Sequence, residues 1–245
     1  MSERFFSAEP IVGERANLAG QEAHHLLHVM RARVGDRVML FDGSGAEFAA
    51  VIESLGRTDV SLRVEGKDAV DRELPFMIVV GVALPKGDRQ KWLVEKLTEL
   101  GVTTLVPLVT ERGVAQPTAA ALERLERCVV DAAKQCGRNR LMQIAQPQHW
   151  HEWISPDTHR AWLGSRGSAP PESRRLLAHR QGTPLVGFDH SSPLPTALAI
   201  GPEGGFSDAE VSAATDAGWQ PVDLGPRILR IETAAVALAA AVALR

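Results

Sequence analysis

Two glycine-rich stretches near the end of the chain hold the residues whose types and spacing could do chemistry. GPEGGFSDAE at 201–210 follows the apolar run TALAI, and LGPRILRIETAA spans 224–235 after a second apolar piece. Glycine permits left-handed backbone conformations and lets another group approach the backbone closely. Each stretch therefore predicts a sharp turn whose amide groups remain open to a ligand. If the strands before the two loops are neighbours in a parallel sheet, the loops meet at its carboxyl edge.

The first stretch also indicates what ligand it suits. Ser207 and Glu210 have the S-x-x-E spacing of a capping box, which predicts a helix start. The chain lacks the phosphate-binding patterns G-x-G-x-x-G and G-x-x-x-x-G-K-[ST], and Glu203 in the loop would repel an anion. A neutral or cationic ligand therefore fits better, and a tight turn with a good helix cap is the alternative.

The elements that position these loops follow a change of pattern along the chain. Residues 1–70 read as short strands, with DGSG as a hairpin turn between RVMLFDG and EFAAVIESL, and one short helix at GQEAHHLLHVMR. The polar stretch at 65–75 reads as a linker. This part of the chain is therefore expected to be a small β-rich domain.

From residue 76 strands alternate with helices, which predicts an α/β domain with a parallel sheet. FMIVVGVAL reads as a strand buried on both faces, and VTTLVPLVT as the next. Helices are expected between Asp88 and Gly101, with Asp88 as the cap, and over TAAALERLERCVVDAAKQCG. Later apolar pieces end at AWLGS, TALAIG and QPVDLG, whereas the pattern does not order the segment 146–195.

Composition limits the class of protein. The net charge of −3 means that any nucleic-acid binding needs a local basic patch. Cys128 and Cys136 match no zinc, redox or disulfide spacing, so a reducing cytoplasm is expected. The apolar run AAVALAAAVAL is eleven residues long, against about 20 for a membrane span, and MSERFF lacks the core of a signal peptide. The run is expected to be a buried helix, and no membrane partner is expected.

The two loops together resemble the signature pair of the RsmE-type family, the 16S ribosomal RNA uridine-N3 methyltransferases of the SPOUT superfamily. Further similar stretches are RFF, HHLLHVMRARVGD, FDGSG, PKGDRQKWLVEKLTELGV, TERGV and QCGRNR, so the resemblance runs nearly end to end. It implies a PUA-like β-barrel at 1–71 and a SPOUT α/β-knot methyltransferase domain, with a deep trefoil knot, at 72–245. It also implies S-adenosylmethionine as the methyl donor, the small-subunit 16S rRNA as the substrate, and a homodimer through the alanine-rich last helix.

The resemblance assigns roles to the loop residues. The backbone of both loops would grip the cofactor, with Ile200 and Leu224 as apolar walls for the adenine. The family often has a His-Pro-like loop beside the cofactor, and WLGSRGSAP falls there. The residues expected to bind the cofactor are Leu163, Gly164, Ile200, Gly201, Glu203, Gly204, Gly205, Leu224, Gly225, Ile228 and Leu229.

Loss of the uridine N3 proton suggests two catalytic residues. Arg230 could stabilise negative charge on the flanking carbonyl oxygens, and Glu232 could accept the proton. A helix cap or an ion pair is the alternative for both, and another base, even solvent, is open.

RNA contact is expected from dispersed cations, whose phosphate contacts would weaken steeply with salt. The candidates are Arg4, Arg31, Lys86, Arg89, Arg112, Lys134, Arg138 and Arg140. Three of these lie in KQCGRNR at a helix end, where a purely structural role is the alternative. His24 and His28 have a metal-ligand spacing without a third ligand, so no metal is expected. Trp150 and Trp153 are expected in the core or at an interface rather than as a platform for base stacking.

Three other functions stay open. A SPOUT relative could methylate another atom, such as a ribose 2′-hydroxyl, and analysis of the modified nucleoside would separate the two. A silent RNA-binding protein need not bind S-adenosylmethionine. A nicotinamide oxidoreductase is disfavoured because the fingerprint glycines are absent.

Overall fold

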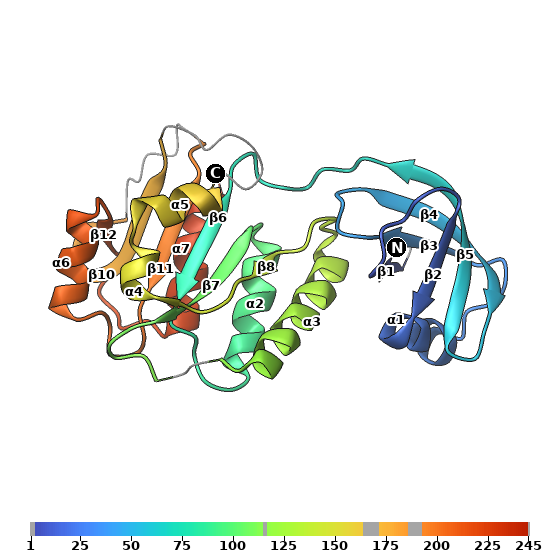
Figure 1. The fold of residues 1–245 in the computed structure, drawn as a ribbon, viewed down its shortest axis with the longest axis horizontal. Helices are drawn as coiled ribbons and strands as arrows, with labels where there is room; N and C mark the ends of the chain where they lie inside the picture. The colour runs from blue at the N-terminus through green and yellow to red at the C-terminus, as the bar shows by residue number, and fades with distance from the viewer. Residues whose placement is uncertain (1–2, 115–116, 164–171, 186–192, 245) are drawn as a thin grey trace. The chain divides into compact units, whose positions relative to one another are not determined.

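The computed structural model describes residues 3–114, 117–163, 172–185 and 193–244 (Figure 1). The chain falls into two compact units. Met1–Glu73 and Val130–Leu141 form the first, and Leu74–Val129 and Met142–Arg245 form the second.

The first unit is built on a five-stranded sheet with the order β1-β3-β4-β5-β2. Only the β1–β3 pair is parallel. Its elements are β1 (Arg4–Phe6), β2 (Arg15–Ala19), α1 (Gly20–His24), the π-helix η1 (His25–Met30), β3 (Arg37–Phe41), β4 (Glu47–Leu55) and β5 (Asp59–Asp68). The expected β-rich domain, its hairpin β3–β4 and its short helix are confirmed, although half of that helix is π-helical.

The hairpin turn follows from its residue types. The Asp42 carboxylate accepts hydrogen bonds from the amides of Ser44, at 3.0 Å, and Ile11, at 2.9 Å. Gly43 and Gly45 adopt positive φ angles of 82° and 101°. Alternate residues of β3 and β4, among them Leu40 and Phe48, are buried in one apolar core.

Part of the stretch expected to be a linker is held by charges inside the first unit. β5 runs on to Asp68, and the Arg72 guanidinium donates to the Glu47 carboxylate at 2.6 Å. Arg4 pairs with the same carboxylate. Burial favours a higher pKa for Glu47, but the hydrogen bonds and positive charges of Arg72 and Arg4 outweigh it and hold its pKa below the usual value. The linker prediction is confirmed in part: β5 takes up the start of the stretch, and the rest, which forms no helix or strand, crosses the boundary between the two units at Glu73 and Leu74.

The second unit has an all-parallel sheet with the order β12-β10-β11-β6-β7-β8, and β9 also pairs with β7. Its strands are β6 (Ile78–Val82), β7 (Thr104–Val109), β8 (Gln143–Ile144), β9 (Gln148–His149), β10 (Arg174–Pro184), β11 (Thr196–Ile200) and β12 (Gln220–Asp223). Its helices are α2 (Arg89–Glu99), the start of α3 (Ala119–Cys136), α4 (Trp150–Trp153), α5 (Pro156–Leu163), α6 (Asp208–Asp216) and α7 (Ile231–Ala243).

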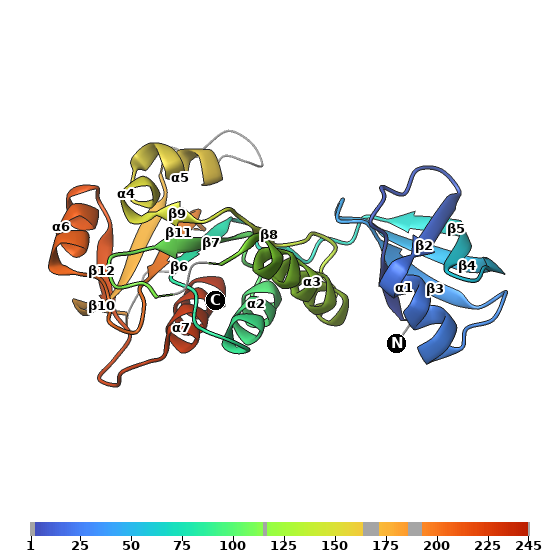
Figure 2. The same cartoon turned by 60° about the horizontal axis from the view of Figure 1, so that its bottom comes forward.

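Helices cover both faces of this sheet. Figure 2 shows α4 and α5 on one side and α2 and α7 on the other. The strands β6 and β11 are buried at every position, as their continuous apolar runs predict. Gly81 of β6 leaves room for the Trp153 ring, which an added Cβ would meet at 2.5 Å. Trp150 and Trp153 therefore belong to the core, as expected.

Three details of the expected second unit need to be added or corrected. The apolar piece that ends at AWLGS belongs to a helix, because Pro156–Leu163 forms α5. The segment that the sequence did not order contains β9, α4, α5 and β10, and β10 lies between β11 and β12. Asp88 occupies the N-cap position of α2, but its side chain makes no capping hydrogen bond.

Candidate active site

The first glycine loop links β11 to α6 and has the expected helix cap. The Glu210 amide donates to Ser207 Oγ at 3.3 Å, and the Ser207 amide donates to the Glu210 carboxylate at 2.9 Å. An added Cβ on Gly201 would meet the Phe206 ring at 3.1 Å. The loop therefore folds tightly back on itself, and Gly205 completes it with a φ of 67°.

The second glycine loop links β12 to α7. The Gly225 amide donates to the Asp223 carboxylate at 3.1 Å, and Gly225 has a φ of 108°, which side chains rarely adopt. Both loops border one cavity of about 400 Å³. The expected convergence of the loops is confirmed, but their strands are not neighbours, because β10 lies between them.

β10 supplies a third wall that the sequence did not predict. Ala178 and Thr183 both pair with Val222 of β12, so the residues between them bulge out of the ladder. Of this bulge, His179, Arg180 and Gln181 line the cavity. The family resemblance implied a His-Pro-like loop beside the cofactor. The histidine that lines this cavity is His179 of β10, and the next residue is Arg180 instead of a proline. Only the short apolar run Leu176–Ala178 marked this strand in the sequence.

The structure brings together nine of the residues expected to bind a cofactor. Those that line the cavity are Ile200, Gly201, Glu203, Gly204, Gly205, Leu224, Gly225, Ile228 and Leu229. Leu163 is the last residue of α5, and its side chain and the whole of Gly164 lie outside the described residues. The role of these two residues stays a prediction.

Arg89, expected to contact RNA, links the first loop to α7 by two ion pairs. From the first turn of α2 its guanidinium lies 3.5 Å from the Glu203 carboxylate and 3.6 Å from that of Glu232. Glu203 belongs to the first loop and Glu232 to the first turn of α7. One cation therefore pairs with a carboxylate from each side of the site.

A second cavity, of about 430 Å³, adjoins the first through Ile228 and Leu229. Its lining residues are Arg89, Trp92, Ile228, Leu229, Arg230, Glu232 and Thr233. Both residues expected to be catalytic, Arg230 and Glu232, therefore lie in one cavity. Arg230 is the N-cap residue of α7 without a side-chain cap bond, whereas the Glu232 Oε2 atom is buried and accepts no hydrogen bond.

Arg112 was also expected to contact RNA, and in the structure its side chain forms hydrogen bonds with the backbone of the first loop. Its guanidinium donates to the carbonyl oxygens of Gly204, at 2.9 Å, and Phe206, at 3.4 Å. The neighbouring amide of Glu111 donates to the Glu210 carboxylate at 2.9 Å. The segment after β7 thus fixes the position of the glycine loop.

The other expected RNA contacts divide by exposure. Arg31, Lys86 and Arg140 are exposed. Arg4 and Lys134 are largely buried in ion pairs with Glu47 and Glu22. Arg138 is 3% exposed and forms a two-pronged pair with Glu73, at 2.6 and 3.0 Å. The expectation that Arg138 meets RNA is therefore corrected: its donors face a carboxylate within the first unit.

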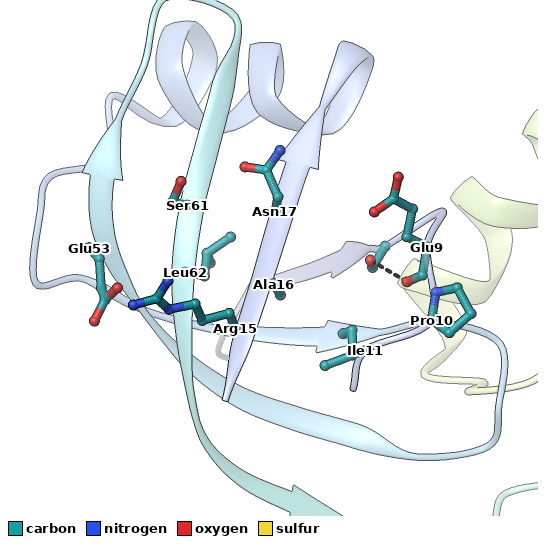
Figure 3. Close-up of a pocket in the computed structure, with 10 residues that line it drawn as sticks. Glu9, Pro10, Ile11, Arg15, Ala16, Asn17, Glu53, Ser61 and Leu62 are labelled. Carbon is teal, nitrogen blue, oxygen red and sulfur yellow. Dashed lines mark hydrogen bonds between the residues drawn. The ribbon is translucent and has the colours of Figure 1, made fainter. Parts of the chain in front are cut away.

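A further cavity, of about 480 Å³, lies in the first unit (Figure 3). Arg15, Asn17 and Ser61 line it together with the carboxylates of Glu9 and Glu53. None of the residues expected to bind RNA lines it. The two acidic groups make it a poor site for a phosphate.

Comparison with known proteins identifies the family. Residues 72–243 match the family model of the RNA methyltransferase domain, and residues 18–65 match that of the RNA methyltransferase PUA domain. The chain belongs to the RNA methyltransferase family. The SPOUT-type fold with an N-terminal PUA domain is thereby confirmed, while the trefoil knot stays an implication of the family resemblance.

Named members of this family are similar over nearly the whole chain. The ribosomal RNA small subunit methyltransferase E of Synechocystis sp. is 36% identical over 94% of this chain and 74% of its own length. That of Mycobacterium tuberculosis is 32% identical over 94% and 87%. The crystal structure of the Neisseria gonorrhoeae enzyme of the same name, bound to S-adenosyl methionine, has a TM-score of 0.85 at 30% identity, covering 98% of this chain and 96% of that one.

Two other features of the described residues bear on function. Within the ranges that the structure describes, no helix is long and apolar enough to cross a membrane. The rings of His24 and His28 lie 4.7 Å apart, but no group of three or more histidine, cysteine or acidic side chains in those ranges could hold a metal ion.

Proposed function

We propose that this chain transfers a methyl group from S-adenosylmethionine to N3 of one uridine in the 16S RNA of the small ribosomal subunit. The observation that carries the proposal is the pair of adjoining cavities. The two glycine loops and the β10 bulge enclose one of them, and the second holds Arg230 and Glu232. Membership of the RNA methyltransferase family, and relatives named for the small-subunit rRNA, support the substrate.

The residues of the first cavity fit S-adenosylmethionine. Its volume lies within the about 300–1,000 Å³ typical of small-molecule sites. Ile200, Leu224 and Ile228 offer apolar contact for the adenosine. The charged side chains in the lining are Glu203, Asp208, Asp223, Arg112, Arg180 and Arg227. This mixture of signs suits a ligand that carries a sulfonium, an ammonium and a carboxylate.

When bound, S-adenosylmethionine supplies an electrophilic methyl group, and the residues of the second cavity prepare the nucleophile. A uridine N3 attacks only after it loses its proton, and negative charge then spreads over the O2 and O4 oxygens. Arg230 donates hydrogen bonds to such an oxygen and stabilises the charge. Glu232 Oε2, which lies 3.6 Å from Arg89 Nη1 and accepts no hydrogen bond, takes the N3 proton. The rest of the rate enhancement comes from positioning.

The partners and organisation form part of the same proposal. Arg31, Lys86 and Arg140 present exposed cations to the RNA. A PUA-like domain at 1–71 precedes the methyltransferase domain at 72–245, and the enzyme acts in the cytoplasm. The last helix, which ends beside Leu244 at 66% exposure, contacts a second copy in a homodimer. Light scattering on the purified chain would show a single-chain mass if the dimer were wrong.

The deciding experiment uses small ribosomal subunits from a strain that lacks this protein. After incubation with the full chain and S-adenosylmethionine, the rRNA is digested and its nucleosides are separated by mass spectrometry. We expect one N3-methyluridine per 16S RNA and none without the protein. A 2′-O-methylated nucleoside would instead assign another target atom, and no modified nucleoside, together with no heat of cofactor binding, would indicate a silent RNA-binding protein.

Gly225→Ala is expected to weaken S-adenosylmethionine binding by at least about tenfold. A side chain at a φ of 108° is strained by about 1–3 kcal/mol, so the second loop must shift away from the cavity that it lines. Gly35→Ala is the matched control, because Gly35 has a φ of 95°, equally open surroundings, and a place in the first unit. Calorimetric titration should show weaker binding for the first variant only, and equal affinities would contradict the role of this loop.

A further inference from the structure

The second cavity has one wall that neither the cofactor nor the catalytic pair explains. Trp92 of α2 lines it and is 42% exposed, although the neighbouring Leu93 and Val94 are fully buried. Ile228, from the loop before α7, lines it too and is 81% exposed. Leaving two large apolar side chains in water is unfavourable, so the apolar face of a flat ring packed against them would gain free energy.

The polar wall of the cavity limits what that ligand is. The lining contains two guanidinium groups, of Arg89 and Arg230, and the Glu232 carboxylate. The Glu232 side chain is 8% exposed. The cavity therefore offers donors beside a buried carboxylate, whose Oε2 atom lies 3.6 Å from Arg89 Nη1 and accepts no hydrogen bond.

Uracil has the complementary edge. Its O2 and O4 atoms accept hydrogen bonds, and its N3–H between them donates one. Cytosine has no proton at N3 and carries an amino group in place of O4, so it would set an acceptor against the carboxylate and a donor against a guanidinium. The arrangement favours uracil because the wrong base leaves buried polar groups unpaired.

We propose that the second cavity receives an extruded uracil ring and that Trp92 is the platform on which this ring stacks. This inference rests on the proposed function and adds a positioning residue to it. A base inside folded RNA must leave its stack to reach an enzyme's reacting centre, and a tryptophan face replaces the lost stacking. Ile228 and Leu229 line both cavities, so a ring on Trp92 lies beside the methyl donor.

The first test measures methylation of small subunits by the full-length chain. Trp92→Ala is expected to lower kcat/KM by about 5- to 150-fold, the range of base–aromatic stacking, while Trp92→Phe keeps most of the rate. S-adenosylmethionine affinity by calorimetry should change by less than about threefold in both. Val114→Ala is the control, since Val114 is 69% exposed in the same unit and lines neither cavity.

The second test reports the contact itself. A single-stranded RNA containing uridine, titrated in the presence of S-adenosylhomocysteine, should quench the fluorescence of the wild-type chain more than that of Trp92→Phe. An RNA with cytidine in place of the uridine should quench both equally. This readout needs no turnover, so it tests the platform even if the wild-type chain forms no N3-methyluridine and the proposed function fails.

Several results would overturn the inference. Trp92→Ala could methylate within about twofold of the wild type, or Trp92→Phe could lose as much activity as Trp92→Ala. Quenching could be identical with and without Trp92. A fall in molar mass for Trp92→Ala in light scattering would assign the exposed ring to a contact between two copies of the chain instead.

Discussion

Replacing Arg230 by alanine should lower the rate of methyl transfer by about 100- to 1,000-fold while S-adenosylmethionine affinity stays within about tenfold. Loss of one preorganised donor to a developing oxyanion has an effect of this size. Arg230 lines the second cavity and is not among the residues that line the first, so its removal affects the nucleophile more than the cofactor. Its side chain is exposed and makes no capping bond, so the fold should tolerate the change.

The measurement is single-turnover methylation of small subunits, with cofactor binding followed by calorimetry on the same preparations. Arg230→Lys is the matched variant, because it keeps the charge but loses the fork of donors. We expect it to recover part of the lost rate. A large loss of cofactor affinity in Arg230→Ala would assign this side chain a structural role in place of a catalytic one. An unchanged rate of methyl transfer would exclude it from the mechanism.

The elements that the sequence predicted well are those whose signals are local. The runs that became β6 and β11 are apolar throughout, which is typical of strands buried on both faces. Ser207 and Glu210 form the predicted capping box, which could be predicted because both residues lie within one helical turn. The two glycine loops could likewise be located from their residue types, and with them nine residues of one cavity.

The neighbours of those loops could not be predicted in this way. The order of strands in a sheet depends on long-range pairing, and β10 takes its place between β11 and β12 from earlier in the chain. Only Leu176 and Leu177 of its eleven residues are buried, so its apolar signal is short. The bulge that brings His179 to the cavity exists only against β12, because it is a difference in register between two strands.

Charged residues showed the same limit more strongly. A cluster of cationic residues has the same sequence pattern whether its side chains face solvent or pair with a carboxylate far away in the sequence. Lys134 pairs with Glu22, 112 positions away, and Arg89 pairs with Glu203, 114 positions away. The sequence therefore identifies which side chains carry charge. The structure shows that several of these side chains form ion pairs within the protein.

Arg138→Ala should accordingly destabilise the protein by about 3–5 kcal/mol, because it leaves the Glu73 carboxylate buried without its cation. Arg138 and Glu73 are 3% and 8% exposed, and their two hydrogen bonds join the segment after α3 to the end of the stretch after β5. Both residues belong to the first unit. Urea unfolding followed by circular dichroism should show an earlier transition for the variant.

A double variant separates this structural role from RNA binding. Arg138→Met with Glu73→Leu removes both charges together, so it should be more stable than Arg138→Ala alone. The exposed neighbour Arg140→Ala is the control, and we expect it to leave the unfolding transition nearly unchanged while weakening RNA affinity. If Arg138→Ala instead kept full stability and lost RNA affinity, the guanidinium would face RNA in solution and the buried pair with Glu73 would be refuted.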